Sequence, residues 1–563
     1  MVRVLNFKVP LTSQKTPIAA VRSDRSATWE LMKQLGPCDS NRPSPPTPQE
    51  ELVLAAFNKP PDSLLELPEA SALPLPFTYH STVNGDVTYL SQPRLSVSKL
   101  LTNTYCELRK YYEIYAGLPS IDSGRLREGR NYHQHLEDQT HAQVNEETLI
   151  SIIDEELEHF LEEEQALLTK NSWGRYLGEQ WIEHGLVRLL FVAEKHFARE
   201  INVHGFINFY NGKLATTAEE LLLAVLVNGI ADIVKIDQSN ANKPYRSTIA
   251  RDEGLSKFIE DLRLQLEILR LNKLRLVDLS EEIPKAKEVV TKLSNEGKYF
   301  LHVRDVKTRA DDLFPPYQLV MTAARDQCLY YARFFDNLSQ STEFAYASHL
   351  ENARRRGVEI DEPLGVAWAL RIIIAQFPVL AQDMKKLARG EPIGCDEFDE
   401  YQKSGGSTTK VEGEAQFSLS NFVTEARFRE MLALFYGDSK EIMEMDILDL
   451  FQPWRYPVTI RYFAARAAQA YNIFESFEPA SVCIEYHNAR SLSIFGFKHY
   501  PFDLKLIEQH MDKASKFWSG QRPPKETNDL TMCRRCDFRT RCPAINKPVD
   551  TLAGDAIYKL LEM

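Results

Sequence analysis

The spacing of apolar residues predicts helices in the first part of the folded chain. Apolar and aromatic residues recur three to four positions apart over 98–117, and this run ends at Gly117 with Pro119 beyond it, which is typical of a helix end. Residues 146–169 and 175–197 show the same period. We therefore expect three helices in this part of the chain.

The period then shortens to that of a β-strand. Residues 200–209 and 222–236 are apolar runs on either side of Asn211-Gly212, a dipeptide that favours a tight hairpin turn. Residues 298–307 predict a further strand. After it we expect a helix that begins at Pro315 and Pro316 and runs through Leu338. Further helices are expected near 422–437, near 458–475 and from about Asp503, with a short strand at 482–486.

Two segments before residue 80 differ from the rest of the chain. The first 23 residues carry four basic and no acidic side chains, with hydroxyl residues between them, which is typical of a mitochondrial transit peptide. A disordered tail is the alternative. From Pro43 to Pro76 nine prolines fall in 34 residues, too many for a helix or a central strand. We therefore predict a targeting segment at 1–40 and a linker at 41–78.

Composition excludes several classes of protein. The chain has 563 residues, of which 67 are Lys or Arg and 79 are Asp or Glu, so its net charge of −12 excludes binding to nucleic acid by bulk positive charge. Its longest apolar run, 221–227, is too short for a membrane helix. Eight cysteines are too few for a disulfide scaffold, so reduced intracellular thiols are expected.

Two carboxylates and a lysine stand on predicted strands. Asp232 follows an apolar run, while Asp305 and Lys307 are two positions apart, which in a strand places both on one face. An acid followed by Asp-x-Lys, each on a strand, is the PD-(D/E)xK arrangement of metal-dependent nucleases. The alternatives are a solvated ion pair for Asp-x-Lys and a capped strand end for Asp232.

Further residues occur in the order that such nucleases show. His133 and Glu137 are four apart and share a face if helical, Glu200 opens the predicted hairpin, and Gln327 and Tyr331 lie on the helix after the Asp-x-Lys strand. This series resembles the RecB-type branch of the PD-(D/E)xK superfamily. A core or surface histidine at 133 and an ordinary helical charge at 137 are the alternatives.

The resemblance implies a role for each of these residues. Asp232 and Asp305 would be the main ligands of Mg²⁺ or Mn²⁺, which prefer oxygen donors, and His133 and the backbone carbonyl of Val306 would be further ligands. Lys307 would orient the attacking water or stabilise the oxyanion. The remaining residues are Glu137 and Glu200, expected to contact the metal through water more than directly, and Gln327 and Tyr331, expected to contact DNA or to position Lys307.

Three cysteines lie close together near the C-terminus. Cys533, Cys536 and Cys542 form C-x2-C-x5-C, a spacing that predicts a metal site. Zinc and an iron-sulfur cluster both require a fourth ligand. No His or Cys follows the motif, and the remote Cys106 is a better candidate than His510.

The chain resembles the fungal exonuclease V family in the order of these features: a single upstream cysteine, the nuclease residues and then this cysteine motif. The matching segments are Glu107-Leu-Arg after Cys106, 136–141, 199–208, Asp305-x-Lys-Thr-Arg309 and 533–539, and the likeness spans about 95–545. It implies an α/β PD-(D/E)xK nuclease core, a central mixed sheet flanked by helices with large helical insertions. It also implies a 4Fe-4S cluster, held by Cys106 and the three C-terminal cysteines, that clamps the two ends of the fold together.

The resemblance also implies a substrate and a compartment. Single-stranded DNA would be digested from 5′ to 3′ into short oligonucleotides by a hydrolase of EC class 3.1, in mitochondrial DNA maintenance in the matrix. A monomer is expected, without a membrane partner, with single-strand-binding protein or other replication and repair factors as candidate partners. The candidate DNA-binding residues, basic side chains and one tyrosine that could stack on bases, are Arg109, Lys110, Tyr112, Arg309, Arg354, Arg355 and Arg535.

Alternatives remain for organisation and function. Asp232 and Asp305 are 73 positions apart, so residues 238–297 would form a helical insertion within the exonuclease domain at 90–545; its helices at 252–277 and 281–296 could instead cap the active site. A tail at 546–563 would follow the domain. The alternative functions are an iron-sulfur-stabilised DNA-binding scaffold of a repair complex with a vestigial nuclease site, and a nuclear or cytoplasmic DNA-repair exonuclease.

Overall fold

The computed structural model describes most of the chain after residue 74. The described residues are 75–83, 94–102, 106–116, 124–141, 144–238, 275–405, 416–527, Cys533, Cys536, Phe538, Arg539 and Cys542. The predictions for 1–40, for most of 41–78, for the helix at 252–277 and for the tail at 546–563 lie outside these residues. The chain divides into two compact units, a larger one from 84–104 and 124–522 and a smaller one from the flanking segments with 105–123.

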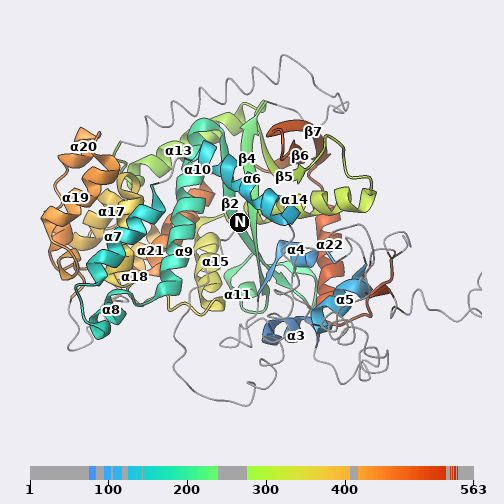
Figure 1. Cartoon of the computed structure of the whole chain (residues 1–563), viewed down its shortest axis with the longest axis horizontal. Helices are drawn as coiled ribbons and strands as arrows, with labels where there is room; N and C mark the ends of the chain where they lie inside the picture. Colours follow the sequence, from blue (N-terminus) through green and yellow to red (C-terminus); the bar gives the residue numbers. More distant parts are fainter. Residues whose placement is uncertain are drawn as a thin grey trace, which may run out of the picture. The chain divides into compact units, whose positions relative to one another are not determined.

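A mixed β-sheet forms the centre of the larger unit (Figure 1). Its strands follow the order β3-β2-β4-β5-β6-β7, and β1 pairs with β4. Neighbours are antiparallel except β1 with β4 and β5 with β6, which are parallel. The bounds are β1 (Arg94–Ser96), β2 (Phe197–Asn208), β3 (Lys213–Leu214), β4 (Val225–Asp237), β5 (Phe300–Arg309), β6 (Pro479–Asn488) and β7 (Ser493–Pro501).

Helices cover both faces of this sheet. Lys307 of β5 contacts Gln327 of α14 (Gln318–Ser339), whereas the next residue, Thr308, faces Gly129 of α6 (Gly124–Thr140), where an added Cβ would lie 3.0 Å from Thr308 Oγ1. Successive side chains of a strand point to opposite faces. Helices α14 and α6 therefore pack on opposite faces of β5.

The predicted hairpin and strands are confirmed, but the short β1 and the longer β7 were not predicted. Gly212 adopts a left-handed φ of 71°, which glycine tolerates, and β2 and β3 pair across this turn. The strand expected at 482–486 is the longer β6, and β7, which pairs with it, was not predicted. All nine residues of β7 are partly or fully exposed, so its sequence lacks the alternation of a half-buried strand.

The helix predicted over 175–197 is a continuous helical segment with a π-helical centre. It begins as α9 (Ser172–Trp181), widens into the π-helix η3 (Ile182–Val187) and ends as α10 (Arg188–Lys195). The prediction over 146–169 was wrong in one respect, because it covers two helices, α7 (Glu146–Leu157) and α8 (Glu162–Leu168).

Further helices pack beside the sheet in the larger unit. Helix α21 (Ile460–Asn472) contacts α15 (Thr342–Arg355), α14 and η3, and ten of its residues are buried. The other helices of eight or more residues are α13 (Leu279–Asn295), α16 (Val366–Ala375), α17 (Phe377–Arg389), α18 (Asp396–Lys403), α19 (Glu425–Tyr436) and α22 (Leu504–Trp518). Among the helices of the described residues, none combines the length and the hydrophobicity that a membrane crossing demands.

The smaller unit joins segments that are distant in the sequence. It contains α3 (Pro76–Val83) and α5 (Glu107–Ala116), and Lys525 N donates a 2.9 Å hydrogen bond to Glu107 Oε2. The prediction of one helix over 98–117 was wrong, because α4 (Val97–Leu100) ends before α5 begins and lies in the larger unit. The polar Thr-Asn-Thr sequence at 102–104 has low helix propensity.

Candidate metal and catalytic site

Strands β4 and β5 bring together the acid and the Asp-x-Lys pair predicted from the sequence. The Asp232 carboxylate accepts a 2.6 Å hydrogen bond from the backbone N–H of Val306, and Lys307 Nζ lies 2.7 Å from Asp305 Oδ2. Asp305 is almost fully buried. The two strands are antiparallel, so residues 73 positions apart in sequence meet at one place in the sheet.

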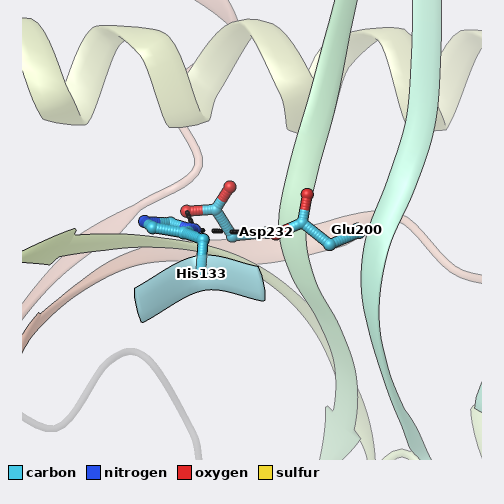
Figure 2. Close-up of side chains that lie close together, drawn as sticks. All are labelled: His133, Glu200 and Asp232. Carbon is cyan, nitrogen blue, oxygen red and sulfur yellow. Dashed lines mark ion pairs between the residues drawn. The ribbon is translucent and has the colours of Figure 1, made fainter. Parts of the chain in front are cut away.

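His133 and Glu200 complete a group with Asp232 (Figure 2). His133 Nδ1 lies 3.6 Å from Glu200 Oε1 and 3.9 Å from Asp232 Oδ2. One ligand atom from each residue lies within 4.8 Å of the others, and the three side chains come from α6, β2 and β4. Two carboxylates and one imidazole in this arrangement can bind a divalent cation.

The charges in this group strongly influence one another. Burial and the neighbouring carboxylate of Asp305 raise the pKa of Asp232 to about 7. Burial also acts to raise the pKa of Glu200, but its pairing with His133 and the charge of Arg188 outweigh burial and lower the pKa to about 2. Burial acts to lower the pKa of His133, but the two carboxylates outweigh it and raise the pKa. A bound divalent cation would offset the electrostatic repulsion between these neighbouring carboxylates.

Asp305 gives an independent sign that the group suits a cation. Its Oδ2 is buried and pairs with the ammonium of Lys307 at 2.7 Å. A buried carboxylate is costly unless cations or hydrogen-bond donors compensate its charge, and Lys307 supplies part of this compensation. The donor set of Asp232, Asp305, Glu200 and His133 therefore fits a hard divalent ion such as Mg²⁺ or Mn²⁺.

Helix α14 contributes a hydrogen-bonded pair that reaches Lys307. Lys307 Nζ donates to Gln327 Oε1 at 3.2 Å, and Gln327 Nε2 donates to the hydroxyl oxygen of Tyr331 at 2.5 Å. Burial acts to lower the pKa of Lys307, but Asp305 and Asp232 outweigh it and raise the pKa, so its ammonium keeps its charge. Gln327 and Tyr331 are thus placed to orient Lys307.

Glu137 lies outside the group of His133, Glu200 and Asp232 and belongs to a second group, with Glu183 and His184, whose ligand atoms also lie within 4.8 Å of one another. Its Oε1 accepts a 2.5 Å hydrogen bond from Nη2 of Arg188, a residue that is only 1% exposed. Two residues near the site, Arg188 and His184, were missed by reasoning from sequence. They lie in a helix recognised only by its apolar spacing, and no motif marks them.

A second network of buried polar side chains was also missed. The hydroxyl of Tyr132, next to His133, lies 2.8 Å from His487 Nδ1, and His487 Nε2 lies 3.2 Å from Glu485 Oε2. Arg304 Nη1 donates to Glu485 Oε1 at 2.7 Å. These contacts fix α6 to β6 and so fix the position of His133. Their residues come from distant segments, and no local pattern reveals the pairing.

The candidate DNA-binding residues of the larger unit have different environments. Arg309 pairs with Asp311, and Arg354 is about half exposed. The prediction for Arg355 does not fit the structure, because its guanidinium is buried and donates to Glu351 and to the carbonyls of Leu221 and Leu222. Arg355 therefore holds α15 against the segment before β4.

The candidate DNA-binding residues of the smaller unit also differ from one another in exposure. Arg109 and Lys110 are partly exposed and pair with Glu113. Tyr112 is buried and its ring lies 5.4 Å from that of Phe538, so it does not offer a stacking surface as predicted. Arg535 lies outside the described residues.

The four predicted cluster ligands all lie in the smaller unit. Cys106, Cys533 and Cys536 are partly buried and Cys542 is buried. Burial, followed by the charges of Cys542 and Cys106, raises the pKa of Tyr112 to about 12, so both thiols lie near this ring. Residues more than 400 positions apart in the sequence thus gather around one tyrosine.

A mixed sheet flanked by helices, with carboxylates, a histidine and a lysine gathered on its central strands, defines an α/β protein consistent with a nuclease. The sequence model of exonuclease V, described as a 5′ deoxyribonuclease, matches residues 89–543. The chain belongs to the exonuclease V family.

Named relatives agree with this assignment. The chain is similar to "Exonuclease V, mitochondrial" of Clavispora lusitaniae, with 41% identity over 92% of this chain and 98% of the relative. It is 33% identical to the protein of that name from Scheffersomyces stipitis, over 88% of this chain and 91% of the relative. The counterpart from Candida dubliniensis is 32% identical over 83% of this chain and 74% of the relative.

Family membership supports a deoxyribonuclease that hydrolyses DNA as its substrate. The names of the relatives support mitochondrial localisation, as the basic N-terminal residues predict. The resemblance seen in the sequence is confirmed at the level of the family.

Proposed function

We propose that this chain is a metal-dependent exonuclease that digests single-stranded DNA from its 5′ end in mitochondrial DNA maintenance. The observation that carries the proposal is the buried Asp305, whose carboxylate pairs with Lys307 at 2.7 Å beside the group of His133, Glu200 and Asp232. A buried acid beside a partly exposed lysine and two further carboxylates suits hydrolysis of a phosphodiester.

Each residue of the candidate site would have a distinct role in hydrolysis. Mg²⁺ or Mn²⁺ would be held by Asp232, Asp305 and His133. The Val306 carbonyl would be a further ligand, and Glu200 would contact the ion directly or through water. When bound, such an ion neutralises charge on the phosphate and makes water more acidic. Lys307 would stabilise the charge that develops on the phosphate oxygens or orient the attacking water, while Gln327 and Tyr331 hold its ammonium in place.

Single-stranded DNA is the substrate that these features favour. The family description specifies a 5′ deoxyribonuclease, and the sequence contains no GxxxxGK[ST] phosphate-binding loop for ATP-driven unwinding. A duplex would therefore have to be opened by another protein. Partly exposed cations such as Arg109, Lys110 and Arg354 could contact the phosphates. Single-strand-binding protein or other replication and repair factors would be partners of a monomeric enzyme that releases short oligonucleotides.

We also propose that Cys106, Cys533, Cys536 and Cys542 bind a 4Fe-4S cluster. All four cysteines lie in the smaller unit, and Cys106 and Cys542 both lie near the ring of Tyr112. Four cysteine thiolates are the ligand set that such clusters use. Because the cluster ligands lie in the smaller unit and the carboxylates in the larger one, a structural role is favoured.

The experiment that tests the function compares the two ends of one substrate. Anaerobically purified full-length protein is mixed with single-stranded DNA labelled at the 5′ or the 3′ end, with and without Mg²⁺. Early release of the 5′ label in a short oligonucleotide, only when Mg²⁺ is present, is the expected result. An absence of digestion by protein that retains its iron would instead favour a DNA-binding scaffold with a vestigial site.

A further inference from the structure

Glu200 has an unusual backbone conformation for its place in a strand. Its φ is 52°, in the left-handed region that side chains other than glycine rarely adopt. The ladder between β2 and β4 pairs Arg199 with Ile233 and Ile201 with Ala231, but Glu200 is left out of the pairing opposite Asp232. The strand is therefore distorted at the residue that faces the candidate metal ligands.

Two side chains from the helical segment 172–195 hold this distortion in place. Arg188 Nη1 donates to the carbonyl of Arg199 at 2.8 Å and to that of Glu200 at 3.3 Å, while His184 Nδ1 lies 2.9 Å from the Glu200 carbonyl. In a regular strand successive carbonyls point to opposite sides. Because one nitrogen contacts both carbonyls, the peptide at Glu200 is turned out of the regular ladder.

His184 and Arg188 are four positions apart, so both side chains project from one face of the helical segment toward the same carbonyl. His184 lies within η3, and Arg188 is the first residue of α10 directly after it. Widened π-helical turns occur often at functional sites. A carbonyl only accepts hydrogen bonds, so the His184 ring must carry its proton on Nδ1.

We propose that His184 and Arg188 are positioning residues that turn the Glu200 backbone so that its carboxylate faces His133 and Asp232. They thereby set the affinity of the site for its divalent ion. This inference rests on the proposed metal-dependent function. Arg188 also donates to Glu137 Oε1, so the same guanidinium joins the conformation of Glu200 to helix α6, which carries His133.

Substitutions at His184 separate this role from simple packing. In His184→Asn the side-chain amide can occupy the place of Nδ1 and still donate to the Glu200 carbonyl, whereas in His184→Gln it occupies the place of Nε2 and cannot. His196→Asn is the matched control, because His196 ends the same helical segment, has a left-handed φ that asparagine tolerates, and packs near Tyr299.

The test measures binding of Mn²⁺ to full-length protein by electron paramagnetic resonance, together with digestion over a range of Mn²⁺ concentrations. We expect His184→Gln to weaken Mn²⁺ binding about 10- to 100-fold, the effect typical of residues that support metal ligands. Digestion should recover at high Mn²⁺. His184→Asn should lie close to wild type, and His196→Asn should match it. Equal Mn²⁺ affinity in all four proteins would overturn the inference.

A second background separates an effect that acts through Glu200 from a general loss of stability in His184→Gln. Glycine adopts the left-handed conformation without help, so Glu200→Gly removes the carboxylate while the turned backbone remains accessible. If His184 acts through Glu200, His184→Gln should not weaken Mn²⁺ binding further in this background. A further loss of the same size would contradict the inference. Failure of wild-type protein to digest DNA would count against the proposed function, since binding of Mn²⁺ is measured independently of digestion.

Discussion

The backbone N–H of Val306 donates a 2.6 Å hydrogen bond to the carboxylate of Asp232. Val306 stands between Asp305 and Lys307, so this one bond fixes the acid of β4 against the Asp-x-Lys pair of β5. Hydrogen bonds to a charged carboxylate are stronger than those between neutral groups. The geometry of the candidate site therefore depends on the sheet itself, whatever the length of the segment that connects the two strands.

Lys307→Ala should slow cleavage by at least about 10²-fold while leaving DNA binding intact. Lys307 Nζ contacts Asp305 and Gln327, and removal of one group that stabilises charge in the transition state typically lowers the rate about 10²- to 10³-fold. Single-turnover digestion of labelled DNA and fluorescence anisotropy measure the two properties. Lys235→Ala is the matched control, since Lys235 is an ion-paired lysine of β4 outside the site. Normal cleavage by Lys307→Ala would contradict the role of this residue.

The stability of the metal-free protein should depend on the titration of Asp232. Its pKa is about 7 in the folded protein and in the ordinary range near 4 when unfolded. Below about pH 4 both states are protonated and the folded state carries no penalty. As the pH rises from about 4 to 7 the unfolded state loses its proton first, so the free energy of unfolding falls by at most about 1.4 kcal/mol per pH unit.

Asp232→Asn should remove this contribution. Melting temperatures measured in EDTA between pH 5 and 8 (about the range over which the group titrates) should decline more for wild type than for the variant. Glu183, whose pKa burial also raises to about 7, is present in both proteins, so the difference between them isolates Asp232. Identical pH profiles would show that Asp232 does not titrate near neutral pH.

The parts of the site that the sequence predicts are those set by short-range periodicity. Asp305 and Lys307 share a face because they are two apart in a strand, and the apolar run around Asp232 marks a buried strand. The meeting of these residues with His133 follows only from family resemblance, because a helix and three strands have to pack before the side chains approach. The helical and strand periodicity of apolar residues predicted the positions of most helices and strands.

The missed features depend on contacts between distant residues or on unusual backbone geometry. The apolar spacing of 175–197 predicts a helix but cannot show that its centre widens into η3. Nothing in the sequence marks Glu200 as left-handed, since that conformation depends on His184 and Arg188. Tyr112 is aromatic and lies shortly after Arg109 and Lys110, a pattern that suits both a stacking surface and a buried helix face. Only its packing against Phe538 distinguishes the two.

Gln327→Leu should lower the rate of cleavage by about 10- to 100-fold, because small misplacements of a catalytic group have effects of this size. Gln327 Oε1 accepts from Lys307 Nζ, and its loss would leave the ammonium less well oriented. Tyr331→Phe should cost less, since it removes only the acceptor for the Gln327 amide. Gln340→Leu, at the end of the same helix, is the control, and digestion under saturating metal is the measurement. Equal rates for Gln327→Leu and this control would exclude a positioning role.

Cys106→Ser and Cys533→Ser should each remove the iron and destabilise the smaller unit. The two residues are 533 − 106 = 427 positions apart, so a cluster that binds both restricts the unfolded chain over a very long loop. Iron content, visible absorbance and limited proteolysis of anaerobically purified protein measure the effect. Cys395→Ser, a substitution at a buried cysteine of the larger unit, should retain the iron. A folded and fully active Cys533→Ser protein without iron would show that the cluster does not clamp the fold.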